Sequence, residues 1–252
     1  MRKTKIVCTL GPACDDEATL TAMCRAGMNV ARLNFSHGVH EDHLRRIVMI
    51  RKVREKLGLP IAILLDTKGP EYRIKTFRDG KVTLKDGDRF TFTTDDVVGD
   101  DTKVSVNYRE LAHELEPGDT ILLSNGLLSF RVEEVEGADI HCTVLIGGEL
   151  SDRKSMSFPG KVLRQVYLNE QDKSDLAFGI ENGVDYVACS FVSCKQDLLD
   201  VREFMQAHGG SDIDLIAKIE NQSGVDNIEE ICSACDGIMV ARGDMGVEIP
   251  FE

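Results

Sequence analysis

Two stretches of the sequence, AGMNVARLNFS at residues 26–36 and NGVDYVACSFVS at residues 182–193, share one pattern that decides the fold. Each passes from a glycine suited to end a helix into a short apolar run rich in β-formers, which finishes in Phe and Ser. A recurring order of helix, glycine and buried strand is typical of βα units whose strands form a parallel sheet. The sequence therefore predicts an α/β fold.

Further apolar runs extend this pattern on both sides. They are KIVCTL, IAILLD, DLIAKI and GIMVA, at residues 5–10, 61–66, 214–219 and 237–241. Helical patterns lie between most of the runs: Asp15 or Asp16 can cap a helix that ends at Gly27, and a second helix is expected before Gly58. On that second helix, His40 and His43 are interpreted as surface residues.

Residues 71 to about 167 have a different character. Short alternating segments such as KVTLKDGDRFTF and TILLSNGLLSFRVEEV are separated by Asp-Gly, Pro-Gly, Asn-Gly and Gly-Gly pairs, which predict hairpins of an inserted all-β domain. The remaining βα part has about 155 residues, enough for five or six units, whereas a closed eight-unit barrel takes about 250. We expect a barrel domain in two parts, residues 1–70 and 168–252, that is incomplete, and a lid domain at 71–167.

Composition and charge exclude several classes of protein. The 252-residue chain has a net charge of −13 and no long basic run, so we expect no nucleic-acid partner. We expect no membrane partner either, because no window has about 18 uninterrupted apolar residues. Eight cysteines in apolar contexts, without a secretory signal, favour reduced thiols and a cytoplasmic location.

Polar residues gather where the predicted strands end. In parallel βα folds, ligands bind at the carboxyl ends of the strands. A single polar residue at such a place commonly belongs to the surface, but their joint placement indicates a site. The residues are Arg32, Asn34 and Ser36 after the second run, Asp66 and Thr67 after the third, Lys218 and Glu220 after the fifth, and Arg242 and Asp244 after the sixth.

These residue types suit a small phosphorylated acid. Glu220 and Asp244 are hard carboxylates that could hold Mg²⁺. Arg32 and Lys218 could offset charge that develops on a phosphoryl group or an enolate. The backbone N–H groups of Gly243 and Asp244 would suit a carboxylate if they open a helix. A further hard cation could bind the oxygen ligands of Asn34, Ser36, Asp66 and Thr67.

Five segments together resemble the pyruvate kinase family: KTKIVCTLGPA, GMNVARLNFSHG, LLDTKGPEYR, AKIENQSGVDNIEEI and DGIMVARGDMGVEIP. The resemblance covers the whole chain. It implies a (β/α)₈ TIM barrel interrupted after its third strand by a β-barrel lid. It also implies phosphoryl transfer from phosphoenolpyruvate to ADP, the last step of glycolysis, by a homo-oligomeric enzyme that uses Mg²⁺ or Mn²⁺ together with K⁺.

The resemblance also implies a role for each matched residue. Arg32 would contact the transferred phosphate, and Lys218 would stabilise the transition state and the enolate. Glu220 and Asp244 would ligate Mg²⁺, and the backbone of Gly243 and Asp244 would receive the substrate carboxylate. The K⁺ ligands would be Asn34, Ser36, Asp66 and Thr67, with Glu71 at the position that accompanies a K⁺ requirement, and the residues facing the nucleotide would be Asn34, His37, Arg73 and Lys154.

Three departures from the family pattern stand out. Ser124, Asn125 and Gly126 replace an Asp-Asp-Gly turn in the lid, and KSMSFPG at residues 154–160 stands where the family has Lys-Gly-Val-Asn before Leu-Pro-Gly; both bear on lid closure. The third is length, because the family continues through two more barrel strands and a C-terminal domain. A barrel truncated after the sixth strand would expose two strand edges, so we expect a fragment of a longer protein or pairing with a second copy.

Three alternatives stay open at this point. A Mg²⁺-dependent lyase or aldolase that acts on a pyruvate enolate would need a similar set of Glu, Asp and Arg. The tripeptide Arg242–Asp244 has the sequence that adhesion proteins present in exposed loops. An inactive fragment that retains only metal or ligand binding is the third alternative.

Overall fold

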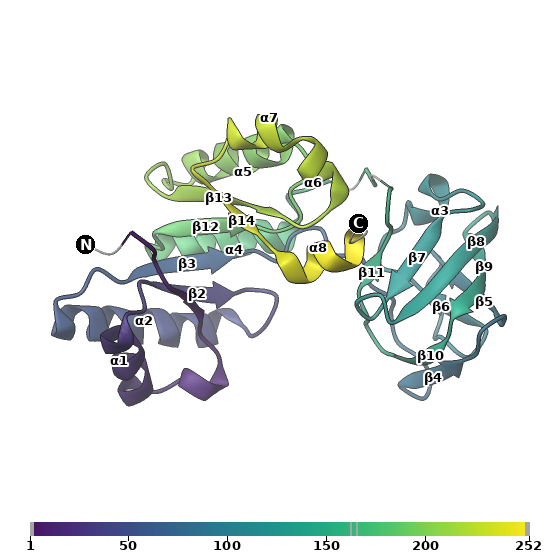
Figure 1. Ribbon diagram of the computed structural model, residues 1–252, viewed down its shortest axis with the longest axis horizontal. Coiled ribbons are helices and arrows are strands. Elements are labelled where there is room, and N and C mark those ends of the chain that lie inside the picture. Colours follow the sequence, from purple (N-terminus) through teal and green to yellow (C-terminus); the bar gives the residue numbers. More distant parts are fainter. Residues whose placement is uncertain (1–2, 162, 165, 250–252) are drawn as a thin grey trace. The chain divides into compact units, whose positions relative to one another are not determined.

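The computed structural model describes residues 3–161, 163–164 and 166–249. The chain divides into two compact units, each with a sheet of its own (Figure 1). The barrel unit consists of Met1–Pro70 with Val166–Ala241, and the lid unit consists of Glu71–Gln165 with Arg242–Glu252. The sequence grouped 168–252 as one segment, whereas the structure groups residues after Ala241 with the lid unit, and residues 250–252 lie outside the described range.

The barrel unit contains a parallel sheet of six strands in chain order. They are β1 (Val7–Thr9), β2 (Val30–Asn34), β3 (Ala62–Asp66), β12 (Tyr186–Cys189), β13 (Asp214–Ile219) and β14 (Gly237–Val240). This is the order of successive strands in a (β/α)₈ barrel, so the predicted TIM-type fold is confirmed for the part that these strands form. Since Asn34 pairs with Asp66 and Ala188 with the same Asp66, three neighbouring strands end at one level.

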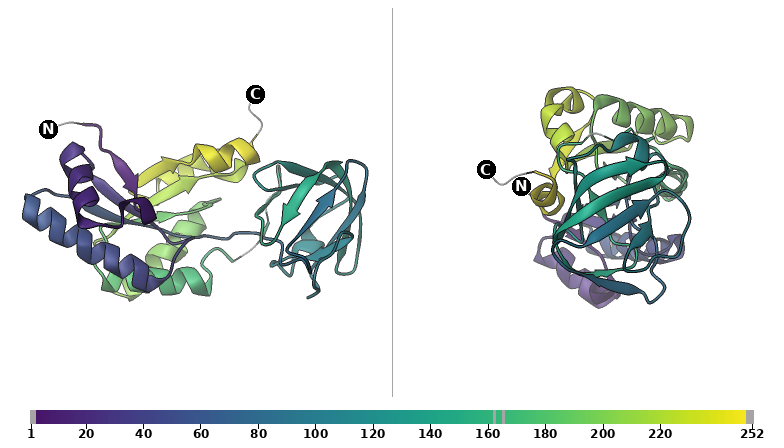
Figure 2. Two further views of the ribbon diagram at one scale, coloured as in Figure 1. Left: turned by 90° about the horizontal axis from the view of Figure 1, so that it is seen from below. Right: turned by 90° about the vertical axis from the view of Figure 1, so that its right-hand side faces the viewer.

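The helices of the barrel unit follow the strands along the chain, and Figure 2 shows them beside the sheet from a second direction. Helix α1 packs on α2, and α5 packs on β13 and on α7. The middle of β3 is buried on both faces, as parallel sheets covered by helices require. The helices are η1 (Pro12–Cys14, a 3-10 helix), α1 (Glu17–Ala26), α2 (His40–Leu57), α4 (Glu170–Glu181), α5 (Lys195–Ala207), α6 (Gln222–Asp226) and α7 (Ile228–Cys232).

Local sequence signals set the helix ends. Asp16 caps α1 by accepting a hydrogen bond from the Thr19 N–H at 2.8 Å. Gly27 ends α1 and Gly58 ends α2, both in the left-handed conformation that glycine adopts without steric cost. The two helix ends expected from the sequence are therefore confirmed, and Asp16 is the cap.

The interpretation of His43 as a surface residue is wrong, whereas His40 is partly exposed. The His43 side chain is buried and stacks on Phe35, with ring centroids 4.0 Å apart. His43 Nε2 lies 2.9 Å from the His37 carbonyl oxygen, and His40 Nε2 lies 2.6 Å from a carboxylate oxygen of the buried Asp175. His40 also stacks on Phe178 of α4, and burial lowers the pKa of His43.

The lid unit is built mainly from β-strands. Its six-stranded sheet has the order β11-β7-β8-β9-β5-β6, and β4 and β10 form a separate pair. The rings of Phe90, Phe92 and Phe130 are fully buried and meet in tilted and edge-to-face contacts at its core. The elements are β4 (Lys81–Leu84), β5 (Arg89–Thr93), β6 (Lys103–Ser105), α3 (Leu111–Glu114), β7 (Thr120–Leu123), β8 (Leu128–Glu136), β9 (Asp139–Ile146), β10 (Gly148–Ser151), β11 (Met156–Ser157) and α8 (Arg242–Glu248).

The hairpin prediction holds for part of the lid unit. Strands β7, β8 and β9 pair antiparallel in succession, and the β7–β8 turn places Ser124, Asn125 and Gly126 all at positive φ. The hairpin expected from KVTLKDGDRFTF is wrong, because β4 pairs with β10 and β5 pairs with β9 and β6. The intervening turn is tied to the β9–β10 corner instead, since the Gly147 N–H donates to Asp86 at 2.7 Å.

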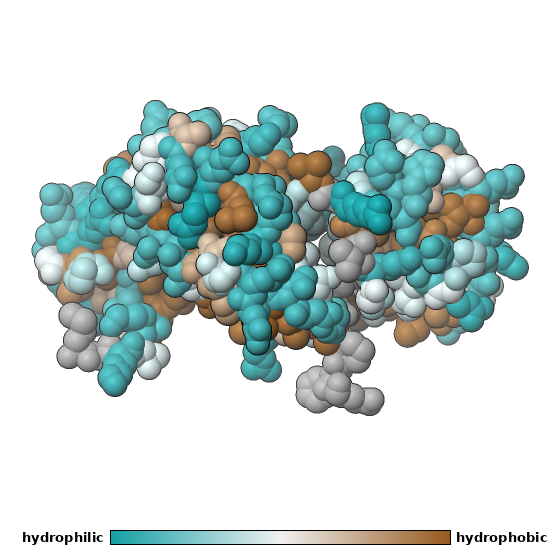
Figure 3. Space-filling view, turned by 90° about the horizontal axis from the view of Figure 1, so that it is seen from above, coloured by the Kyte–Doolittle hydropathy of each residue, from teal (hydrophilic) through white to brown (hydrophobic). Residues whose placement is uncertain are grey.

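No helix among the described residues combines the length and the apolarity that crossing a membrane demands. In the space-filling view of Figure 3, hydrophilic side chains cover most of the visible face, and apolar side chains form small separate groups.

The segment after β3 lies against the segment after β12. Gly69 has φ of 71°, and a Cβ atom there would lie 2.7 Å from the Ser190 carbonyl oxygen. The Gly69 N–H donates to Asp172 in the first turn of α4 at 3.3 Å. Burial raises the pKa of Asp172 from 3.8 to about 6. Only glycine allows this close approach, so Gly69 sets the spacing of two strand ends.

Replacing Gly69 with alanine is expected to destabilise the barrel unit more than the same change at Gly58. Both residues have positive φ, which costs alanine about 1–2 kcal/mol. Only at Gly69 does the added Cβ meet backbone atoms, and overpacking of this kind costs about a further 1–3 kcal/mol. Urea unfolding of Gly69→Ala and Gly58→Ala measures the difference in unfolding free energy. Equal losses of stability would contradict the prediction, because they would mean that the added Cβ at residue 69 is accommodated without cost.

The buried Asp172 is expected to make the protein less stable as the pH rises from about 4 to about 6. Its pKa in the folded state is raised, so in this range the folded state holds a proton that the unfolded state has lost. The contribution is on the order of 2–3 kcal/mol. Unfolding free energies of the natural protein and of Asp172→Asn, which does not titrate, should diverge by this amount across the range. A difference that is constant with pH would contradict the raised pKa.

Candidate active site

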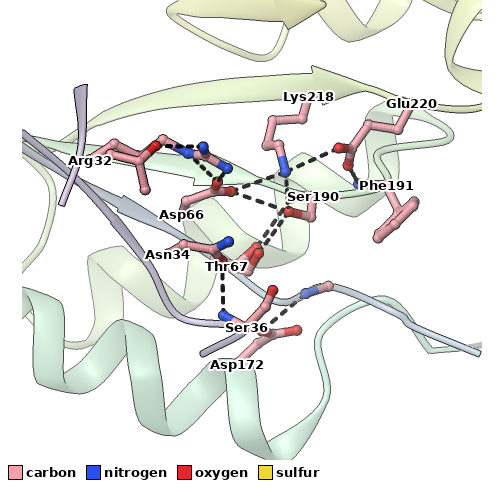
Figure 4. A network of polar contacts seen from close by, with 12 residues as sticks. Arg32, Asn34, Ser36, Asp66, Thr67, Asp172, Ser190, Phe191, Lys218 and Glu220 are labelled. Carbon is pink, nitrogen blue, oxygen red and sulfur yellow. Dashed lines mark hydrogen bonds and ion pairs between the residues drawn. The ribbon is translucent and has the colours of Figure 1, made fainter. Parts of the chain in front are cut away.

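A buried carboxylate joins three strand ends of the barrel unit (Figure 4). Asp66, at the end of β3, is almost completely buried. Its Oδ2 accepts a hydrogen bond from Arg32 Nε on β2 at 2.6 Å, and its Oδ1 lies 3.1 Å from Lys218 Nζ on β13. The structure thus brings together Arg32, Asp66 and Lys218, which the sequence placed at strand ends without showing that they touch.

Lys218 is held from three directions. Its Nζ donates a hydrogen bond to Ser190 Oγ at 2.6 Å and forms ion pairs with Asp66 and, at 3.0 Å, with Glu220 Oε1. Only 9% of the lysine side chain is exposed. The second oxygen of Glu220 accepts a hydrogen bond from the Phe191 N–H at 2.6 Å. A lysine with a flexible stem is therefore fixed in one place by surrounding oxygens.

The four charged side chains of this network balance one another. Arg32 and Lys218 are cations, and Asp66 and Glu220 are anions; the three residues other than Arg32 are buried, and about a quarter of the Arg32 side chain is exposed. Buried charges are tolerated when they are paired and hydrogen-bonded. A phosphorylated acid would add negative charge to this neutral set, and a divalent cation beside Glu220 would offset it. The donor set therefore fits an anionic substrate bound with a metal.

Magnesium commonly takes one or two protein carboxylates and completes its shell with water and substrate oxygens. Glu220 supplies a buried carboxylate in the barrel unit. Among the described residues, no group of three or more His, Cys, Asp and Glu side chains is arranged to hold a metal ion.

The four residues predicted to bind K⁺ lie at the ends of β2 and β3. Asn34 and Asp66 are partners in the register of these strands, and Asn34 Oδ1 accepts a hydrogen bond from the Ser36 N–H at 3.0 Å. Thr67 Oγ1 accepts a hydrogen bond from the Ser190 N–H at 3.1 Å. These oxygens have the chemistry that a hard monovalent cation prefers, and Asp66 is already engaged by Arg32 and Lys218.

The remaining predicted residues are distributed over the two units. His37 follows β2 and is exposed. Within the lid unit, Arg73 forms an ion pair with Glu71 and bridges to Ser155, next to Lys154. The Ile74 N–H donates to the Lys154 carbonyl at 3.1 Å, so these two predicted nucleotide residues are on adjacent segments.

Gly243 and Asp244 lie on a helix and not on a strand. Strand β14 stops at Val240 and Arg242 begins α8, so Arg242 and Asp244 follow the sixth strand, and Gly243 and Asp244 open a helix, the condition under which their N–H groups would suit a carboxylate. Their N–H groups lie in the first turn of the helix, where they lack intrahelical acceptors. The tripeptide Arg242–Asp244 is therefore helical, unlike an adhesion loop. Because α8 groups with the lid unit, pairing of Asp244 with Glu220 stays a prediction.

Ser190, Phe191 and Asp172 are not among the residues predicted from the sequence. The repeat shared by residues 26–36 and 182–193 indicates the position of Ser190, because aligning its two copies at the glycines places Ser190 opposite Asn34. Phe191 has φ of 57°, which is uncommon for a residue with a large side chain. Strained residues of this kind concentrate at functional sites.

Comparisons with known proteins agree with the site that the geometry describes. The sequence model of the family described as "Pyruvate kinase, barrel domain" matches residues 1–252. Proteins named pyruvate kinase are 50% identical to the chain in Clostridium perfringens, 46% identical in Clostridium acetobutylicum and 48% identical in Geobacillus stearothermophilus.

Each of these alignments covers 100% of the chain but only 53%, 54% and 43% of the relatives, respectively. The chain thus spans about half the length of the curated relatives it matches. A family match over the full chain, together with identities near one half, identifies the family. The chain belongs to the pyruvate kinase family.

Proposed function

We propose that the protein transfers a phosphoryl group from phosphoenolpyruvate to ADP, producing pyruvate and ATP in the last step of glycolysis. The observation that carries this proposal is the buried, charge-neutral network of Arg32, Asp66, Lys218 and Glu220 at the carboxyl ends of the strands. Proteins named pyruvate kinase that align with the whole chain support it. The chain then acts as a transferase.

In this mechanism the two cations have distinct tasks. Arg32 is partly exposed and already oriented by Asp66, so its outer N–H groups can meet the oxygens of the transferred phosphoryl group. Lys218 is buried and fixed, so its charge can stabilise the negative charge that develops on the phosphoryl oxygens and on the enolate of pyruvate. Fixed charges need no reorganisation during the reaction, which is why positioning accounts for most of such catalysis.

The cations of the family have proposed ligands in this chain. Glu220 and Asp244 would hold Mg²⁺ or Mn²⁺, and the backbone N–H groups of Gly243 and Asp244 would receive the carboxylate of the substrate. When bound, the divalent ion would neutralise charge on phosphate oxygens. For K⁺ we propose oxygens of Asn34, Ser36, Asp66 and Thr67, accompanied by Glu71. The hard oxygen donors among these residues support both assignments.

For the nucleotide we propose contacts with Asn34, His37, Arg73 and Lys154. All four carry N–H donors for phosphate or ribose oxygens, and His37 also has an aromatic ring. Arg73 and Lys154 are neighbours within the lid unit, which supports a common role.

For the compartment we propose the cytoplasm, in agreement with eight cysteines that are all free thiols.

Replacing Lys218 with methionine is expected to lower kcat for ADP-dependent pyruvate formation by about 10²- to 10³-fold, because a preorganised charge is lost at the reacting group. Lys173→Met is the matched control, since the Lys173 side chain on α4 is 40% exposed and, among described residues, forms an ion pair only with the surface residue Glu170. The assay follows pyruvate formation from phosphoenolpyruvate with and without ADP, Mg²⁺ and K⁺.

The other possible outcomes of this assay contradict different parts of the proposal. Pyruvate release without ADP would contradict a kinase and indicate a lyase or an aldolase. Absence of turnover in a folded sample that still binds Mn²⁺ would indicate a protein that only binds ligands. A Lys218→Met variant as active as the Lys173→Met control would remove the proposed role of Lys218.

We also propose that the chain associates with a second copy of itself. Strands β1 and β14 are the two edges of the sheet in the described part of the chain, and Val7, Ile238 and Val240 on them are exposed. Exposed apolar edges are surfaces that proteins cover. Ile238→Lys is expected to shift sedimentation toward the monomer, whereas Val48→Lys, at an exposed position on α2, should not. A natural protein that is monomeric at all concentrations would contradict this part of the proposal.

A further inference from the structure

Ser190 is at the centre of the hydrogen bonds around the active site, although its role is not among the predicted ones (Figure 4). It follows the last residue of β12 and is almost completely buried. Its N–H donates to Thr67 Oγ1 at 3.1 Å, and its carbonyl accepts a hydrogen bond from the Tyr167 hydroxyl at 2.7 Å. The backbone of Ser190 is thus fixed on both sides of its Cα.

The single hydroxyl proton of Ser190 has a defined destination. Ser190 Oγ lies 2.7 Å from the Thr67 carbonyl oxygen, which can only accept, and 3.3 Å from Asp66 Oδ1. The shorter contact takes the proton. A lone pair of Ser190 Oγ therefore faces Lys218 Nζ, which donates to it at 2.6 Å. The order of donation runs from Lys218 to Ser190 and from Ser190 to Thr67.

This order decides how Lys218 is oriented. Asp66 and Glu220 approach the ammonium group as ion pairs, at 3.1 Å and 3.0 Å. Coulombic attraction between charges is not directional, and either carboxylate could pull a flexible lysine toward itself. The hydroxyl of Ser190 supplies a third, short and directional contact that holds the ammonium group between them.

The neighbouring residue holds Glu220 in the same way. Phe191 has a left-handed backbone, which is unfavourable for a residue with a Cβ atom, and in this conformation its N–H donates to Glu220 Oε2 at 2.6 Å. The successive residues Ser190 and Phe191 therefore contact both members of the Lys218–Glu220 ion pair.

We propose that Ser190 is a positioning residue for Lys218. Its hydroxyl orients the ammonium group toward the place of the transferred phosphoryl group before the substrate arrives. The inference rests on the proposed kinase function for its catalytic consequence. The orientation itself depends only on the contacts of Ser190, Thr67 and Lys218.

The test compares Ser190→Ala with Ser193→Ala, which removes a hydroxyl from the same loop without touching Lys218. In Ser190→Ala, kcat should fall about 10- to 100-fold, the loss expected for a hydrogen bond to a charged group, while KM for phosphoenolpyruvate stays within about twofold. Ser193→Ala should behave like the natural protein. A loss confined to KM, or none, would overturn the proposal.

A second readout does not depend on turnover. The ¹H–¹⁵N signal of the Lys218 ammonium group, identified by its absence in Lys218→Met, should exchange its protons with water at least about tenfold faster in Ser190→Ala than in the natural protein. Unchanged exchange would overturn the proposal. If the natural protein forms no pyruvate, the kinase function fails, yet the exchange rates still decide whether Ser190 holds Lys218.

A conservative variant covers the case in which Ser190→Ala does not fold. Ser190→Cys fills the site with a slightly larger side chain, but a thiol is a weaker donor and acceptor than a hydroxyl. Its kcat and its ammonium exchange rate should lie between those of the natural protein and those expected for full loss of the hydrogen bond. Values equal to those of the natural protein would contradict a positioning role.

Discussion

Burial of the Asp66 carboxylate is the constraint on which the rest of the site depends. A carboxylate without water must have cations or donors on its lone pairs, and leaving such a charge unpaired typically costs about 3–5 kcal/mol. Arg32 approaches it from the preceding strand, and Lys218 approaches it from a strand two places further on, across β12. One anion thus requires three strand ends to stop at the same level, and this requirement holds two cations on the two oxygens of one carboxylate.

The backbone segments around Asp66 meet this constraint by packing closely against each other. Gly69 lets the chain after β3 pass against Ser190, and the same serine carries the hydrogen bonds of Thr67 and Lys218. Phe191 accepts an unfavourable backbone conformation and directs its N–H at Glu220. The backbone strain at Phe191 and the missing side chain at Gly69 therefore serve one arrangement. Both are explained by the charged side chains that they help to position.

The sequence predicted the regular features well and the local exceptions poorly. Strand ends with Arg32, Asp66, Lys218 and Glu220 could be predicted because strand periodicity and the rule for parallel sheets act along the chain. For Ser190 the repeat gives only its position opposite Asn34, because its contacts are with residues 28 and 123 positions away along the chain. His43 was placed on the surface because α2 is charged along most of its length. The helix that begins at Arg242 could be stated from the sequence only as a condition, because an apolar run followed by charges also fits an extended strand end.

The balance of charge in the resting site has a kinetic meaning. Two cations and two anions held within a few bond lengths produce a field that decays rapidly with distance, so the site exerts little attraction on a ligand still in solution. The chain as a whole carries −13 and repels free phosphorylated acids while it attracts divalent cations. If the proposed substrate is correct, the form that approaches most freely is therefore one whose charge is already partly balanced by a divalent cation, because the bare acid is repelled more strongly.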